Sequence, residues 1–91
     1  MSRHELEQRD KTIAEGQLEI AIGWDRPLNT YFVQVLDPTY DEEDARFEVL
    51  WRGNRFGEIL SSGEAIAMIS PWAIIPADLQ AALIADRDTA T

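Results

Sequence analysis

The chain has 91 residues, of which 45% are hydrophobic, and it carries a formal net charge of −9. The length predicts one folded domain of modest stability, and the hydrophobic content excludes a wholly disordered chain. It has no cysteine, which excludes disulfides and cysteine-based zinc sites, and no run of about 18–20 apolar residues, so we expect a cytoplasmic protein without a membrane span. The acidic charge repels phosphate backbones, so direct nucleic-acid binding is not expected.

The first 16 residues are predicted to form a charged N-terminal arm or helix, separate from a single α+β domain over residues 17–91. Ser2 and Glu5 match a capping box, in which the two side chains satisfy backbone N–H groups at a helix start. Glu5 and Arg9 also form a favourable i,i+4 pair. Because the segment has few apolar residues, we expect it to be weakly docked.

Three stretches alternate between apolar and polar residues, at 18–24, 29–37 and 46–52, which is typical of β-strands. Pro27 favours a turn between the first two strands, and Asp25 is expected to cap this turn by accepting a backbone N–H. Both faces of the second strand are apolar, which favours a central position in the sheet.

In the third strand the alternation predicts that Phe47, Val49 and Trp51 form the apolar face. Trp24 lies on the apolar face of the first strand. We therefore expect at least two of the three tryptophans, the third being Trp72, to meet in one core.

Residues 55–59 are predicted to add a short fourth strand, and two helices are predicted after it. Ser61 and Glu64 match a second capping box, and Pro76 is expected at the first position of the last helix. A sheet with one apolar face needs a cover. The predicted fold is therefore α+β, an antiparallel three- or four-stranded meander packed against two short C-terminal helices, with an N-terminal helix as an optional addition.

The stretch DPTYDEEDARF, residues 37–47, separates the second and third predicted strands. Residues 37 to 48 contain six acidic residues and one arginine, the strongest charge bias in the chain. We predict that the six acidic residues form a partner-binding surface: Asp37, Asp41, Glu42, Glu43, Asp44 and Glu48. The alternative is an ordinary acidic hairpin loop that only aids solubility.

The same stretch partly resembles a calcium-binding loop, since Asp37, Asp41 and Glu48 occupy ligand positions 1, 5 and 12 of an EF-hand. Glu42, however, occupies the position where that loop needs glycine for its sharp turn. The flanking segments are also predicted to be strands and not helices. No metal site is therefore predicted.

Enzyme chemistry has little support in this sequence. The only histidine, His4, lies in the charged arm, and the serines at 61 and 62 are explained as helix caps. We predict no catalytic residue, no cofactor and no enzymatic activity. Loss of a measurable turnover on mutation of Asp25 or Arg52 would contradict this prediction.

The segments IGWDRPLNTYFVQVLD, WRGNRFGEI and IPADLQAALIADR resemble small acidic bacterial proteins encoded on plasmids and other mobile genetic elements. The shared pattern is a GWDxPL turn, an aromatic-rich strand and a GEI segment before the helices. The chain is also similar to anti-CRISPR proteins, in size and charge only. This resemblance implies an inhibitor that binds a protein.

The predicted function is that of a small non-enzymatic protein-binding module, an inhibitor that occupies a basic nucleic-acid-binding surface of a partner protein. Lysines and arginines in such a surface do not distinguish carboxylates from phosphates by charge alone. The alternative is a homodimeric structural or adaptor domain that pairs through an edge strand or an apolar patch.

Overall fold

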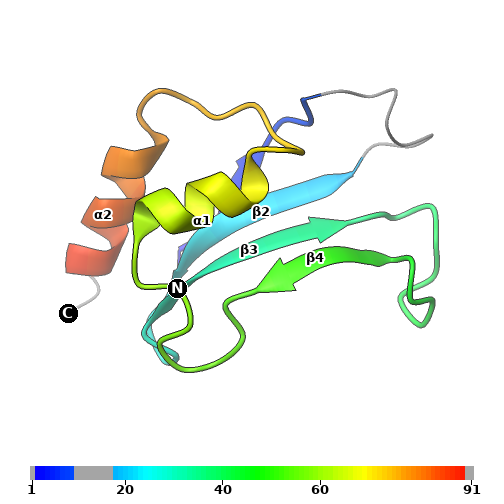
Figure 1. The fold of residues 1–91 in the computed structure, drawn as a ribbon, viewed down its shortest axis with the longest axis horizontal. Helices are drawn as coiled ribbons and strands as arrows, with labels where there is room; N and C mark the ends of the chain where they lie inside the picture. Colours follow the sequence, from blue (N-terminus) through cyan, green and yellow to red (C-terminus); the bar gives the residue numbers. More distant parts are fainter. Residues whose placement is uncertain (1, 10–17, 90–91) are drawn as a thin grey trace.

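The computed structural model describes residues 2–9 and 18–89, which form a four-stranded antiparallel sheet with two helices packed on one face (Figure 1). The strands lie side by side in chain order, β1-β2-β3-β4. This arrangement confirms the predicted α+β class. The elements are β1 (His4–Leu6), β2 (Glu19–Asp25), β3 (Thr30–Leu36), β4 (Glu48–Arg52), α1 (Ser62–Ile69) and α2 (Leu79–Thr89).

The core lies between the helices and one face of β2 and β3. Trp24 of β2 packs against Tyr31 of β3 in an edge-to-face contact, with ring centroids 4.8 Å apart. The Tyr31 hydroxyl donates to the Leu83 carbonyl at 3.2 Å, which ties α2 to the centre of the sheet. The remaining core residues of these elements are Ile20, Ile22, Val33, Val35, Ala65, Ile69 and Leu79.

The turn between β2 and β3 forms as the sequence predicts. The Asp25 carboxylate accepts the backbone N–H of Leu28 at 3.3 Å, and Asn29 has a left-handed backbone with φ of 50°. Asparagine tolerates this conformation better than most residues. The expected capping role of Asp25 is therefore confirmed.

The helix boundaries agree with the predicted caps at one helix and differ at the other. Ser61 is the N-cap of α1, where its hydroxyl accepts the backbone N–H of Glu64 at 3.3 Å. The second helix, α2, begins at Leu79, so the prediction that Pro76 takes its first position is wrong. Pro76 instead closes the preceding turn, where its carbonyl accepts the Leu79 N–H at 3.1 Å.

The N-terminal segment is a strand where the sequence favoured a helix, since β1 pairs antiparallel with β2. Ser2 does not cap a helix, because its hydroxyl accepts the backbone N–H of Trp24 at 2.9 Å. An i,i+4 ion pair stabilises a helix by only about 0.2–0.5 kcal/mol, whereas pairing with β2 satisfies backbone groups along a sheet edge. Residues 10–16 of the predicted arm lie outside the described residues.

Residues 55–59 do not form the predicted fourth strand, because this segment is a series of turns and bends. Ile59 nevertheless anchors it to the start of β3. Its N–H donates to the Thr30 hydroxyl at 2.7 Å, and its carbonyl accepts the Tyr31 N–H at 2.9 Å. The fourth strand of the sheet is β1 instead.

Candidate functional site

The acidic loop joins β3 to β4 and is organised by its own hydrogen bonds. The Asp37 N–H donates to the Phe47 carbonyl at 2.8 Å, which closes the loop at its base. Within it, the Asp44 N–H donates to the Asp41 carbonyl at 2.8 Å, and the Phe47 N–H donates to the Asp44 carbonyl at 3.0 Å. These bonds hold the acidic side chains on a folded support.

Two of the six predicted partner-binding residues are used inside the loop. The first, Asp37, accepts hydrogen bonds from the Thr39 N–H at 3.1 Å and from the Thr39 hydroxyl at 2.6 Å. The second, Asp44, forms an ion pair with Arg46, whose Nη2 lies 2.7 Å from Oδ2. Both carboxylates therefore have a structural role.

The Asp44–Arg46 pair is completed by an aromatic ring. The Arg46 guanidinium lies 4.3 Å from the centroid of the Tyr40 ring, a cation–π contact. The hydrogen bond from the Arg46 side chain, and then that from its backbone N–H, lower the pKa of Asp44 from 3.8 to about 2. This loop thus shows how an arginine is held by one carboxylate and one aromatic face.

The other four predicted residues are exposed acidic side chains. Among residues 2–9 and 18–89, no ion pair involves the carboxylates of Asp41, Glu42, Glu43 or Glu48. In the same described part of the chain, no three histidine, cysteine, aspartate or glutamate side chains are grouped so that they could hold a metal ion. The four carboxylates are available for a contact outside the molecule.

The structure places Trp51 on the sheet face opposite the helices, contrary to the prediction for this strand. Trp51 pairs with Gln34, and Leu50 pairs with Val35, so Leu50 is the residue of β4 that packs against the core. Val49 and Trp51 are 40% and 45% exposed. The predicted apolar face of Phe47, Val49 and Trp51 is therefore wrong as a core face.

The register between β3 and β4 explains the difference. The pairing shifts between Val35 and Leu36, so an irregularity interrupts the alternation of β4 at Val49. Two tryptophans still contribute to the core, since Trp24 is buried and Trp72 packs partly buried against it.

A groove of about 420 Å³ lies on this open face of the sheet, next to the acidic loop. Glu42 reaches it from the loop, and Glu48 reaches it from the start of β4. The other lining residues are Gln34, Leu36, Phe47 and Trp51. The structure thus brings two of the six predicted residues together around an apolar surface.

A smaller hollow of about 120 Å³ adjoins the groove on the other side of Trp51 and Gln34. It is lined by Arg3, whose Nη1 donates to the Gln34 side-chain oxygen at 3.2 Å. Sequence reasoning missed this face because it placed Trp51 in the core and Arg3 in a helix. The glutamine at position 34 was the available signal, since it is a polar residue in the middle of a central strand.

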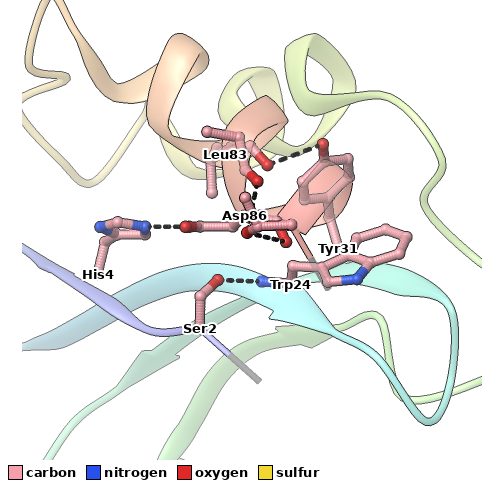
Figure 2. Close-up of polar contacts among 8 residues, drawn as sticks. Ser2, His4, Trp24, Tyr31, Leu83 and Asp86 are labelled. Carbon is pink, nitrogen blue, oxygen red and sulfur yellow. Dashed lines mark hydrogen bonds and ion pairs between the residues drawn. The ribbon is translucent and has the colours of Figure 1, made fainter. Parts of the chain in front are cut away.

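The only histidine, His4, connects the first strand of the described chain, β1, to the last helix, α2 (Figure 2). His4 Nε2 lies 2.6 Å from Asp86 Oδ2, which links β1 to α2, and both side chains are half-buried. The Tyr31–Leu83 and Ser2–Trp24 contacts lie in the same region. The His4–Asp86 and Tyr31–Leu83 contacts connect the sheet to α2, whereas the Ser2–Trp24 contact holds the N-terminal segment to β2. His4 therefore has a structural role.

Comparisons with protein-family models, with curated proteins and with solved structures find no match for this chain. None of the helices among the described residues has the length and apolar character needed to cross a membrane. Function is therefore inferred from the chemistry of the chain's own surface.

Proposed function

We propose that this protein is a non-enzymatic binding module that engages a basic surface of another protein through its acidic loop and the adjoining open sheet face. The observation that carries the proposal is the set of four exposed carboxylates without ion pairs in the described chain, two of which, Glu42 and Glu48, line one groove with the exposed Trp51. Complementary charge gives specificity and speeds association, and a central tryptophan commonly contributes much of the binding energy.

The folded state of the loop favours this function. A loop that is already hydrogen-bonded from Asp37 to Phe47 loses less conformational freedom on binding than a flexible acidic tail does. The Asp44–Arg46 pair contributes to this order without using the other carboxylates. The acidic groups are thus presented in a defined arrangement.

The partner surface in this proposal is one that otherwise binds nucleic acid, so the protein acts as an inhibitor by occupying it. The net charge of −9 supports inhibition of this kind, because a negative charge is attracted to a basic channel and is repelled by the nucleic acid itself. The resemblance in size and charge to anti-CRISPR proteins is in keeping with it.

The test is capture of partners from a bacterial lysate, followed by binding measurements with each purified partner. Neutralisation of three loop carboxylates is expected to weaken binding by roughly tenfold or more, as is a rise in salt beyond roughly 0.5 M. The loop variant carries Asp41→Asn, Glu42→Gln and Glu43→Gln.

A matched control neutralises three exposed carboxylates outside the acidic loop, which changes the net charge equally. This variant carries Glu7→Gln, Glu64→Gln and Asp78→Asn. It is expected to bind nearly as well as the unmodified protein. Binding that survives both the loop variant and high salt would reject the proposal and favour the homodimeric alternative.

A further inference from the structure

We infer that the groove beside Trp51 receives an arginine or lysine side chain from an extended basic segment of the partner protein. This inference rests on the proposed function and deepens it, because it names the contact point and the chemistry of the occupant. The groove is lined by Glu42 and Glu48 together with three apolar side chains and one amide, and no cationic residue lines it.

The lining matches the two parts of a basic side chain. The rings of Phe47 and Trp51 and the side chain of Leu36 offer an apolar surface for the methylene groups. Glu42 and Glu48 provide two negative charges for the cationic end. The volume of about 420 Å³ lies within the range of roughly 300–1,000 Å³ typical of ligand pockets.

The chain itself shows this chemistry once, in the acidic loop close to the groove. Arg46 lies over the Tyr40 ring and pairs with Asp44 on the same loop. In the adjoining hollow, Arg3 shares the lining with Trp51 and donates to the side-chain amide oxygen of Gln34, so an arginine already lies near this aromatic residue. The groove has the same components, an aromatic surface with carboxylates, but its lining contains no arginine.

Charge complementarity favours a basic segment over a second copy of this chain. Two carboxylates and no cationic residue line the groove, so an inserted cation meets complementary charge there. A second copy also carries a net charge of −9. Of the two edge strands of the sheet, β1 and β4, the second contacts β3 and no other helix or strand of the described chain, and its irregularity at Val49 disfavours edge pairing.

Arginine is expected to bind more tightly than lysine. Its planar guanidinium stacks on aromatic rings and donates to two carboxylate oxygens at once, whereas the ammonium group of lysine acts as a compact, strongly hydrated charge.

The experiment measures binding of fluorescently labelled peptides of alternating arginine and glycine, and of alternating lysine and glycine, by anisotropy at low salt. The groove variant is Glu42→Gln with Glu48→Gln. The matched variant is Asp41→Asn with Glu43→Gln, which has the same change in net charge but leaves the groove lining intact. We expect the groove variant to bind the arginine peptide roughly tenfold more weakly and the matched variant about twofold more weakly.

A second measurement follows tryptophan emission, because Trp51 is exposed in the groove while Trp24 is buried and Trp72 is partly buried. The peptide is expected to change the emission of the unmodified protein. It is not expected to do so in Trp51→Phe, which retains an aromatic ring at the groove.

The outcomes separate the inference from the function on which it rests. If neither peptide binds the unmodified protein, the groove inference is rejected, while the proposed function is still decided by the salt and loop-variant tests with the captured partner. If peptides bind but the two double variants weaken binding equally, the charge function stands and the groove is rejected. A salt-insensitive dimer that shields Trp51 would also reject the inference, since a second copy would then occupy this face.

Discussion

Replacement of Gly53 by alanine is predicted to destabilise the protein strongly, because the chain turns sharply there at the end of β4. Gly53 has a φ of 87°, a backbone conformation that residues with a Cβ rarely adopt. A Cβ at this position would overlap the Tyr31 carbonyl oxygen and would lie 2.6 Å from the Phe32 Cα. Both neighbours belong to the backbone of the central strand β3 and cannot move aside without shifting the sheet.

The expected cost has two parts. A left-handed backbone costs roughly 1–2 kcal/mol for a residue with a side chain, and overpacking against backbone atoms costs roughly 1–3 kcal/mol. The free energy of unfolding should therefore fall by about 2–5 kcal/mol. This is a large part of the total of about 5–15 kcal/mol that is usual for a domain.

Gly57 provides the matched control. Its φ of 64° lies in the same region of backbone conformation, but a Cβ there would meet no heavy atom within 4 Å. Gly57→Ala is therefore expected to cost only the backbone part, roughly 1–2 kcal/mol. The entropy effect of alanine on the unfolded chain is common to both variants and cancels in their difference.

The assay is urea denaturation of both variants and the unmodified protein, followed by circular dichroism. We expect Gly53→Ala to unfold with a free energy about 1–3 kcal/mol below that of Gly57→Ala, at an unchanged m-value. Equal losses in the two variants would refute the reasoning, because the contact with β3 would then contribute nothing.

Three further predictions concern the core and the loop. Leu83→Ala should lower the free energy of unfolding by about 2–5 kcal/mol, because Leu83 is fully buried. Ile84→Ala, at a neighbouring site that is 36% exposed, should lower it by about 1 kcal/mol or less in the same denaturation assay. Tyr31→Phe should cost about 1 kcal/mol through loss of the hydrogen bond to Leu83. Burial also raises the pKa of the Tyr31 hydroxyl above 10.0, so this hydroxyl loses its proton at lower pH in the unfolded chain than in the folded protein. The free energy of unfolding should therefore fall as pH rises above about 10. Tyr31→Phe should flatten this dependence in alkaline denaturation curves. The carboxyl of Asp44 should titrate with a pKa of about 2 by NMR, and its pKa should return toward 3.8 in Arg46→Ala. Because the pKa of Asp44 is lower in the folded protein than in the unfolded chain, the pair with Arg46 stabilises the protein above about pH 3.8. This contribution is lost as pH falls through 2. An unchanged Asp44 pKa in that variant would show that Arg46 does not cause the shift.

The local elements could be predicted because their signals lie close together in the chain. Alternation in residues 18–24 and 29–37 specified β2 and β3, and Asp25 and Ser61 act on N–H groups three residues away. An acidic loop between two strands follows from the same reasoning, since charged residues interrupt the alternation. Such short-range effects require no knowledge of distant partners.

The N-terminal strand needed information from the rest of the chain. Three residues of mixed polarity, His4 to Leu6, have no strand pattern of their own. Their pairing depends on the exposed edge of β2 and on Asp86, which is far away in the sequence. Local helix signals were weak, and the long-range backbone pairing outweighed them.

The candidate site was predicted only in part for the same reason. The sequence by itself determined that the acidic residues cluster between two strands and that the chain lacks the elements of a metal loop. The tertiary structure decided which carboxylates are used within the loop and which line the groove with Trp51. The cause is the register shift between β3 and β4, which places Leu50 on the core face and Trp51 on the open face of the sheet. A side chain in a strand changes face with every single-residue shift in pairing, so this shift could not be read from the alternation alone.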